Sequence, residues 1–283
     1  MTNAFYLLAE EREDLDALTA VHEALLKRVN ELRTRERLGR SRTSEVISAQ
    51  AQLHRVEAEL ELVQSQERIA RQLLEFLTGR ERIEKIADPW DSSLPALDQE
   101  ETYLAKAVTR PDVLAADEAT KAAKENVRVV QAAFWPTVGL DGNYYLERAG
   151  VSKDVKWDAT FKVDVPIFQG GQAMGGVRQA SSQARQAKLR AAEARRRGLQ
   201  EIRDAYTRVQ TGLQRTTVLA RALDETEESY QYQVEEYRRS LINNLEVLQA
   251  LQILQDARRE LIHANYEAKR QYWQLKAIAG EKP

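Results

Sequence analysis

The sequence of 283 residues has no cysteine, only 6 prolines and 12 glycines, and no long hydrophobic run. Without cysteine the chain can form neither a disulfide nor a thiolate metal site. The apolar runs fall far short of the roughly 20 residues that a membrane-spanning helix needs, so any membrane contact is expected through strands. The first twelve residues also lack a basic region followed by an apolar core, so they do not resemble an export signal.

An excess of charge of one sign is also lacking. The 42 basic and 44 acidic residues give a formal net charge of −2, which argues against a nucleic-acid partner. The three histidines, His22, His54 and His263, lie in separate predicted helices without a metal-spaced carboxylate motif. The sequence shows no glycine-rich phosphate loop and no nucleophile signature. We therefore expect no catalysis, no cofactor and no metal.

Helical periodicity dominates what is present. Apolar residues recur at spacings of three, four and seven in three long segments, 3–37, 44–77 and 244–279. From Val46 the spacing alternates between three and four, as in a coiled-coil seam, and this frame reaches Leu77 with Glu67 as its one polar break. Ser44 is expected to be the N-cap of this helix and Gly79 its stop.

Other helices are expected around 100–108, over 112–134, and from the Gly170-Gly171 bend to about Tyr237. Proline at positions 89 and 95 interrupts the linker that precedes them, because proline lacks an amide donor and disfavours helix before it.

The chain contains an internal repeat. Adding 201 to a residue number carries Val46 onto Val247, Leu53 onto Leu254, and Gly79 onto Gly280, so residues 1–79 duplicate 202–280 without a gap. In the second copy a helix, a hairpin and the top of a long helix precede the duplicated part. We therefore expect about 90 residues of this kind to precede Met1, and the sequence to be incomplete at its N-terminus.

Residues 137–147 and 156–168 break the helical pattern with a period of two, which predicts a β-hairpin joined by residues 148–155. Their length fits the apolar height of an outer-membrane barrel, about 25 Å. In that interpretation the apolar parity faces lipid: Val138, Leu140, Tyr144, Leu146, Trp157, Phe161, Val163, Val165 and Ile167. A two-stranded ribbon of a soluble domain, with one face on a core, fits the same alternation.

Five short motifs follow one another in order along the chain: Arg110-Pro111-Asp112, Ala133-Phe134-Trp135-Pro136, Val165-Pro166-Ile167-Phe168-Gln169-Gly170-Gly171, Glu246-Val247-Leu248, and Leu275 to Gly280. Together with the repeat, they resemble the outer-membrane efflux (TolC) family over nearly the whole chain. The resemblance implies a mainly α fold, in which long antiparallel coiled-coil helical hairpins form an α-barrel tunnel and the β-hairpin contributes to an outer-membrane β-barrel. It also implies a homotrimer in the outer membrane that extends into the periplasm.

The resemblance divides the chain into five parts: a first helical hairpin (1–79), a linker or equatorial region (80–109), an ascending helix (110–136), the barrel hairpin (137–168) and a second helical hairpin (169–280). The family pattern has four strands in each protomer and a cleavable export signal, whereas this sequence shows two strands.

The implied function is a passive exit duct of a tripartite efflux or type I secretion system, carrying small molecules or proteins. Its partners would be a periplasmic adaptor (membrane fusion) protein, outer-membrane lipid and, indirectly, an inner-membrane pump. A soluble structural coiled-coil protein, with the β-hairpin as an interaction module, remains the alternative.

Two kinds of site follow from the resemblance. Tyr237, Glu246 and Glu45 match gate positions of the family, although Ile242 and Gln249 replace a charged pair of its best-known member. The two glutamates could equally complement helix N-termini through the helix dipole. The tips of the helical hairpins resemble the adaptor-contact surface, although exposed polar turns can also be inert. These tip residues are Gly39, Arg40, Ser41, Ser240, Leu241, Ile242 and Asn243.

Overall fold

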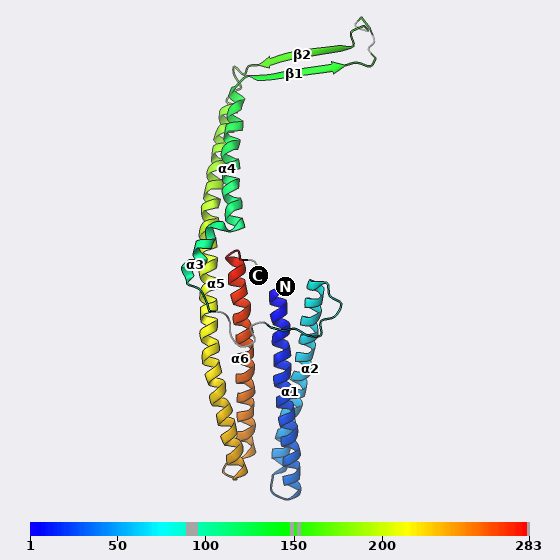
Figure 1. Ribbon diagram of the computed structural model, residues 1–283, viewed down its shortest axis with the longest axis vertical. Helices are drawn as coiled ribbons and strands as arrows, with labels where there is room; N and C mark the ends of the chain where they lie inside the picture. The colour runs from blue at the N-terminus through cyan, green and yellow to red at the C-terminus, as the bar shows by residue number, and fades with distance from the viewer. Residues whose placement is uncertain (89–95, 148–149, 152–153, 282–283) are drawn as a thin grey trace. The chain divides into compact units, whose positions relative to one another are not determined.

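The computed structural model describes residues 1–88, 96–147, 150–151 and 154–281 (Figure 1). The linker prolines at 89 and 95 therefore lie outside the described residues. Two compact units can be distinguished, one formed by 1–104 with 201–283 and the other by 105–200. The first unit is helical, and the second combines two helices with a two-stranded sheet, which confirms the predicted mainly α fold.

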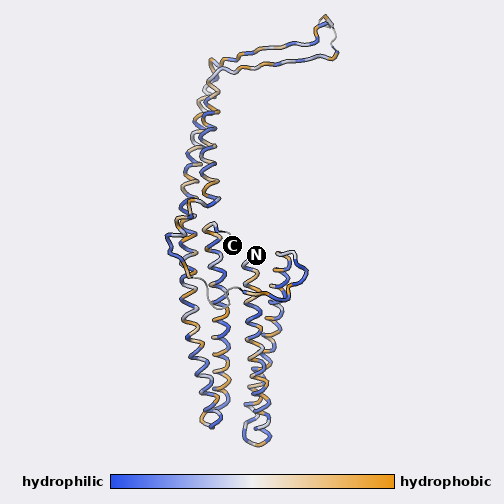
Figure 2. The backbone as a smooth tube through the Cα atoms, viewed as in Figure 1, coloured by the Kyte–Doolittle hydropathy of each residue, from blue (hydrophilic) through white to orange (hydrophobic). Residues whose placement is uncertain are grey.

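The first unit is built from pairs of long helices (Figure 1). Helix α1 (Thr2–Arg37) packs along α2 (Thr43–Thr78), and α6 (Asn244–Ile278) packs beside α1 and the second part of α5 (Gln172–Arg238). The short α3 (Glu100–Ala105) ends at the boundary with the second unit, where the 3-10 turn η1 (Lys106–Thr109) follows, and the two together occupy the predicted position of a short helix. Hydrophobic residues recur at intervals along each helix, as expected for amphipathic helices (Figure 2).

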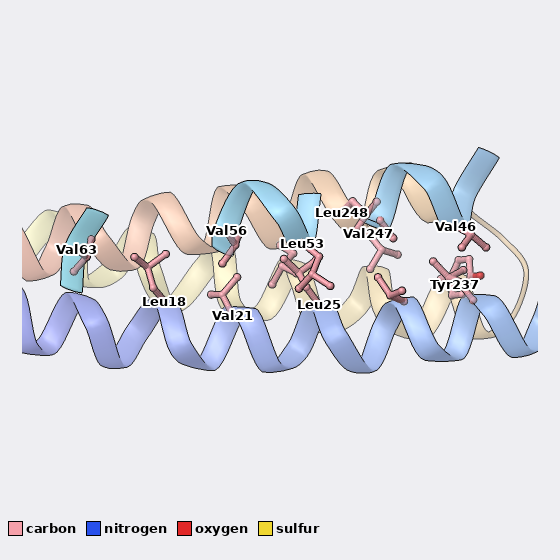
Figure 3. Close-up of a cluster of buried hydrophobic side chains, with 14 residues drawn as sticks. Leu18, Val21, Leu25, Val46, Leu53, Val56, Val63, Tyr237, Val247 and Leu248 are labelled. Carbon is pink, nitrogen blue, oxygen red and sulfur yellow. The ribbon is translucent and has the colours of Figure 1, made fainter. Parts of the chain in front are cut away.

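The seam between α1 and α2 forms the main core of this unit (Figure 3). Every predicted apolar position of the α2 frame is buried or half-buried except Leu77, which is 39% exposed. Leu18, Leu25 and Leu32 of α1 are fully buried against this frame. Truncating any of these leucines to alanine would cost about 2–5 kcal/mol.

The repeat is visible in the packing. Val46 and Val247 are both buried, as are Leu53 and Leu254, so the same frame faces inward in α2 and α6. Both copies end at a glycine with a positive φ, and Gly79 adopts the left-handed conformation that the sequence predicts for a helix stop.

The N-terminus of α2 corrects one prediction. The helix begins at Thr43 with Arg42 as its N-cap, so Ser44 lies inside the first turn and does not cap it. The carboxylate of Glu45 takes the capping role, because its Oε2 accepts a hydrogen bond from the backbone N–H of Arg42 at 3.4 Å. A glutamate at the third helical position satisfies the backbone N–H of the N-cap residue in this way.

The second unit contains α4 (Pro111–Gln131), the 3-10 turn η2 (Ala132–Phe134), the strands β1 (Thr137–Tyr144) and β2 (Trp157–Asp164), and the first part of α5. Pro111 is the first residue of α4 and not the residue before it, since proline has no N–H to leave unpaired at that position. α4 packs closely on α5 at Gly176, whose Cα leaves room for Val130, and at the ion pair between Arg195 and Asp117.

The strands form an antiparallel hairpin in which the side chains alternate between the two faces as predicted. Leu140 lies opposite Phe161 and Val138 opposite Val163, so the apolar residues share one face. The strands are shorter than predicted, and Leu146, Val165 and Ile167 lie beyond their ends. Pro166 lacks the N–H that would extend the ladder on the β2 side.

No helix in the described part of the chain is long and apolar enough to cross a membrane.

Candidate gate, tips and hairpin surface

The two helical hairpins end in the same backbone turn. Gly39 and Ser240 occupy equivalent positions with φ values of 66° and 62°. The backbone N–H of Arg40 donates to the carbonyl five residues earlier at 2.8 Å, and that of Leu241 does the same at 2.9 Å. Such hydrogen bonds are typical of an α-helix that ends in one residue of left-handed conformation. The repeat therefore preserves the turn although its side chains differ.

The two predicted gate glutamates cap the helices that follow these turns. Glu45 accepts hydrogen bonds from the backbone N–H of Arg42 and from the hydroxyl of Ser41. Glu246 accepts from the backbone N–H of Asn243 at 3.4 Å, while the side-chain oxygen of Asn243 accepts from the N–H of Glu246 at 3.3 Å. Both carboxylates therefore complement a helix N-terminus, and their gating role stays a prediction.

Tyr237 is buried at the end of α5, beside Val46 in the main core (Figure 3). Two arginines of α1 lie over its ring, with the guanidinium carbon of Arg28 at 3.9 Å from the ring centroid and that of Arg35 at 5.0 Å. Contacts of this kind are worth about 0.5–2 kcal/mol, with the larger values where water is excluded.

Arg28 also reaches the start of α6. Its Nε donates to Oδ1 of Asn244 at 2.9 Å, and its Nη1 donates to Glu31 at 3.2 Å. Asn244 is almost completely buried. Within the described residues, the Nη2 of Arg28 and the Nδ2 of Asn244 are buried without a hydrogen-bond partner. We call Arg28, Arg35, Tyr237 and Asn244 the Arg28 cluster.

Of the three predicted gate residues, only Tyr237 belongs to the Arg28 cluster. In the part of the chain that the structure describes, no hydrogen bond or ion pair joins Tyr237 to Glu45 or Glu246. Sequence reasoning missed Arg28, Arg35 and Asn244. Two arginines seven residues apart, beside the α1 seam, were the available signal, because heptad spacing keeps both on one face.

The histidines lie where the sequence predicted, on three different helices. His54 Nδ1 is 2.8 Å from the carboxylate of Glu57, His22 Nε2 is 3.5 Å from the same carboxylate, and His263 pairs with Glu10. The hydrogen bond from His54 lowers the pKa of the Glu57 carboxyl. No group of three or more potential ligands among the described residues is arranged to hold a metal ion.

The β-hairpin is exposed on both faces. The apolar face carries the opposed pairs Val138 with Val163, Leu140 with Phe161, and Tyr144 with Trp157. The other face is polar, and Asn143 donates a hydrogen bond to Asp158 across the strands at 3.1 Å. No described residue covers the apolar face, so the core that the soluble-ribbon interpretation needs is not present in the described part of the chain.

The groove between the start of α5 and the end of β2 is also apolar. Phe134, Ile167, Phe168 and Met174 line it, and all four are more than half exposed. These aromatic and aliphatic side chains form an apolar surface beside the first turn of α5.

The chain matches the family model of the "Outer membrane efflux protein" family over residues 105–281. It is 25% identical over 162 residues to the "Cation efflux system protein CusC" of Escherichia coli (strain K12), a match that covers 56% of this chain and 35% of CusC. It is 25% identical over 176 residues to "Nodulation protein T" of Rhizobium leguminosarum bv. viciae, covering 60% of this chain and 36% of that protein. The aligned part of the chain thus spans about a third of the length of these curated relatives.

Solved structures with the same fold include the outer membrane protein VceC of Vibrio cholerae, with a TM-score of 0.84 and 24% identity over 99% of this chain and 68% of VceC. A crystal structure of CusC gives a TM-score of 0.85 and 19% identity, over 99% of this chain and 67% of that chain. At these identities the likeness establishes the fold. The family model covers more than half of the chain, and the chain therefore belongs to the outer membrane efflux protein family.

Proposed function

We propose that this chain is part of a passive exit duct of a tripartite efflux or type I secretion system, which carries small molecules or proteins across the periplasm and the outer membrane. The observation that carries this proposal is the uncovered apolar face of the hairpin. A chain that leaves paired aromatic and aliphatic side chains exposed on one face of a sheet needs lipid, or further strands, to cover them.

The hairpin supplies two strands of an outer-membrane barrel. Its polar face, with Asp141, Lys162 and the Asn143–Asp158 pair, would line an aqueous lumen, and its apolar face would meet lipid. Each strand has one edge without a partner strand in the described residues. In lipid, unpaired backbone groups cost several kcal/mol each, so the edges are expected to pair with other strands of the assembly.

The repeat supports a homotrimer. In α6, His263 and Arg270 both contact Glu10 of α1. Their counterparts in α2 are Leu62 and Ile69, which are 59% and 62% exposed. Because α2 corresponds to α6, its outer face corresponds to one that packs on a neighbouring helix. We expect that face to pack on α5 of a neighbouring copy, with three copies closing the ring.

The Arg28 cluster is the proposed gate. It ties the end of α5 and the start of α6 to α1, and these contacts must separate if the second helical hairpin moves away from the first. Ile242 and Gln249 are neutral, so they cannot form the charged pair that the family's best-known member has at these positions. In this chain the cation–π contacts of Tyr237 would hold the gate closed instead. Adaptor binding is proposed at the two tips, and contact with an inner-membrane pump would be indirect.

The test is fractionation of the epitope-tagged protein in its native cells. A duct is expected in the outer-membrane fraction, as a trimer whose mobility on a gel changes when the sample is heated. A tagged outer-membrane porin and a periplasmic protein serve as controls for the two fractions. Recovery of the protein in the soluble fraction as a monomer would contradict the proposal and favour a structural coiled-coil protein.

A further inference from the structure

The tip of the first helical hairpin carries an unusual concentration of positive charge. Between residues 33 and 42 the sequence has five arginines and one glutamate. Arg35 pairs with Glu31 and lies over Tyr237. The other four are exposed, and no ion pair joins them to a carboxylate in the part of the chain that the structure describes. We call these four residues the basic tip: Arg33, Arg37, Arg40 and Arg42.

None of the three nearby carboxylates forms an ion pair with the basic tip in the described part of the chain. Glu31 binds Arg28 and Arg35, and Glu45 caps α2. Glu36 lies on the same turn without an ion pair among the described residues. Among the described residues, no carboxylate therefore forms an ion pair with the basic tip.

The fold of the tip does not need these arginines. The repeat places Val234, Arg238, Leu241 and Asn243 at the equivalent positions of the second tip, so three of the four charges are absent there. Nevertheless the second tip forms the same turn, with the same backbone hydrogen bonds and the same capping glutamate. The side chains of the basic tip are thus free to serve recognition.

The charge and the geometry of the arginines indicate the chemistry of a partner that would bind the basic tip. Four like charges within ten residues repel one another, and like-charged residues four apart on a helix, such as Arg33 and Arg37, destabilise it. At physiological ionic strength the field of such a cluster extends only about 8 Å, so a partner that recognises this charge has to contact the tip. Guanidinium groups pair best with planar carboxylates, which they bind with two parallel hydrogen bonds.

We propose that the basic tip binds an acidic loop of a protein partner, in which several carboxylates surround one apolar residue that meets Leu38. Leu38 follows Arg37 directly in the sequence, is 65% exposed and supplies the apolar contact. This rests on the proposed function, since it gives the chemistry of the adaptor that would meet this tip. The second tip has a different chemistry, because its Arg239 is paired with Glu235 and an exposed leucine, Leu241, stands in place of Arg40.

The experiment measures binding of two synthetic helical-hairpin peptides to the full chain by fluorescence anisotropy. One peptide has a loop with four glutamates around a leucine, and its twin has glutamines in their place. The double variant Arg40→Gln/Arg42→Gln tests the basic tip, and Arg238→Gln/Arg239→Gln is the matched control with the same loss of charge at the second tip.

The glutamate peptide is expected to bind wild type and the control at least about tenfold more tightly than the glutamine peptide, and this preference should fall by about tenfold in Arg40→Gln/Arg42→Gln. Raising the salt concentration should also reduce the preference of wild type for the glutamate peptide. Equal binding of the two peptides, or an equal loss in both double variants, would overturn the proposal.

Binding to vesicles of phosphatidylglycerol tests whether the basic tip binds any anionic surface. If wild type binds these vesicles as tightly as the glutamate peptide, and the double variant loses both, then the tip is a general anion-binding surface and the proposal of a protein partner is wrong. All variants also pass through the fractionation test described above. A protein that is not an outer-membrane trimer contradicts the duct, whereas a normal trimer that does not distinguish the peptides contradicts only the basic tip.

Discussion

Glu67 is the charged residue at the centre of the apolar seam between α1 and α2, and it is almost fully buried there. Its carboxylate accepts hydrogen bonds from Arg12 at 3.0 Å and from Arg71 at 2.5 and 2.6 Å. Burial alone would raise the pKa of the Glu67 carboxyl, but the hydrogen bonds from the two arginines outweigh it and hold the pKa below its ordinary value. A buried ionic group of this kind also favours one register of the two helices.

Replacing Glu67 by glutamine should reduce the free energy of unfolding at neutral pH by about 2–3 kcal/mol. The loss is below that of a fully buried pair because Arg12 and Arg71 remain 24% and 37% exposed. Since the folded pKa is lowered, the stability that Glu67 contributes is present above about pH 4.3 and is lost as the pH falls through the folded pKa. Thermal unfolding from pH 7 to pH 3 should therefore show a smaller pH dependence in Glu67→Gln than in wild type. An unchanged pH dependence would contradict this role.

Arg28 allows a second prediction at this scale, because one side chain contacts both Tyr237 and Asn244. Arg28→Leu retains the aliphatic part of the side chain for packing but removes the guanidinium, and with it the cation–π contact and the hydrogen bond. We expect the amides of the first turn of α6 to exchange with solvent about tenfold faster, which corresponds to about 1.4 kcal/mol. Arg33→Leu, an exposed arginine on the same helix, is the control and should leave the exchange unchanged.

At the scale of elements, the hairpin gives a prediction with opposite signs on its two faces. Phe161→Arg places a charge on the proposed lipid face and should cost about 2–4 kcal/mol near the middle of the bilayer. Lys162→Glu, on the neighbouring polar-face position, should leave assembly intact and change the ion selectivity of the pore. Refolding into bilayers and single-channel recording provide the two measurements. Equal tolerance of both substitutions would contradict the membrane assignment of the hairpin.

The helices show how far local patterns reach. The seam of α2, the stop at Gly79 and the parity of β1 and β2 were predicted from spacing, and the structure confirms them. The N-cap of α2 was predicted at Ser44, two residues after the observed N-cap Arg42, because a serine is only one of several groups that satisfy a helix N-terminus. Glu45 provides the alternative, and spacing does not determine which of the two the backbone selects.

For the whole molecule, membership of the outer membrane efflux protein family agrees with the expected outer-membrane location and with the expected lack of catalysis, since the family consists of outer-membrane transport proteins. The prediction at this scale concerns assembly. Leu62→Glu/Ile69→Glu places two charges on the outer face of α2, where we expect α5 of a neighbouring copy to pack.

The double variant should lose the trimer on unheated gels and in analytical ultracentrifugation, while its circular dichroism keeps the helical signal. Burying two unpaired carboxylates against a neighbouring helix is the physical reason. Ile253→Glu, a comparably exposed position on α6, is the control and should remain trimeric. A double variant that forms normal trimers would rule out this face of α2 as an interface.

The sequence by itself determined the helices and strands of this protein and their inward faces, because each depends on the spacing of residues a few positions apart. It also showed their duplication, through the constant offset of 201 residues. The apolar positions of the α2 frame between Val46 and Leu74 lie on one face of the helix, since a spacing of three and four defines a single stripe. The tertiary structure alone decided which helices meet. The contacts of Arg28 with Asn244 and of Glu10 with His263 join residues more than 200 positions apart, and no periodicity specifies such pairs. Tyr237 was predicted as a gate residue from the family resemblance, whereas the arginines that lie over its ring emerged only from the packing of α1 against the end of α5.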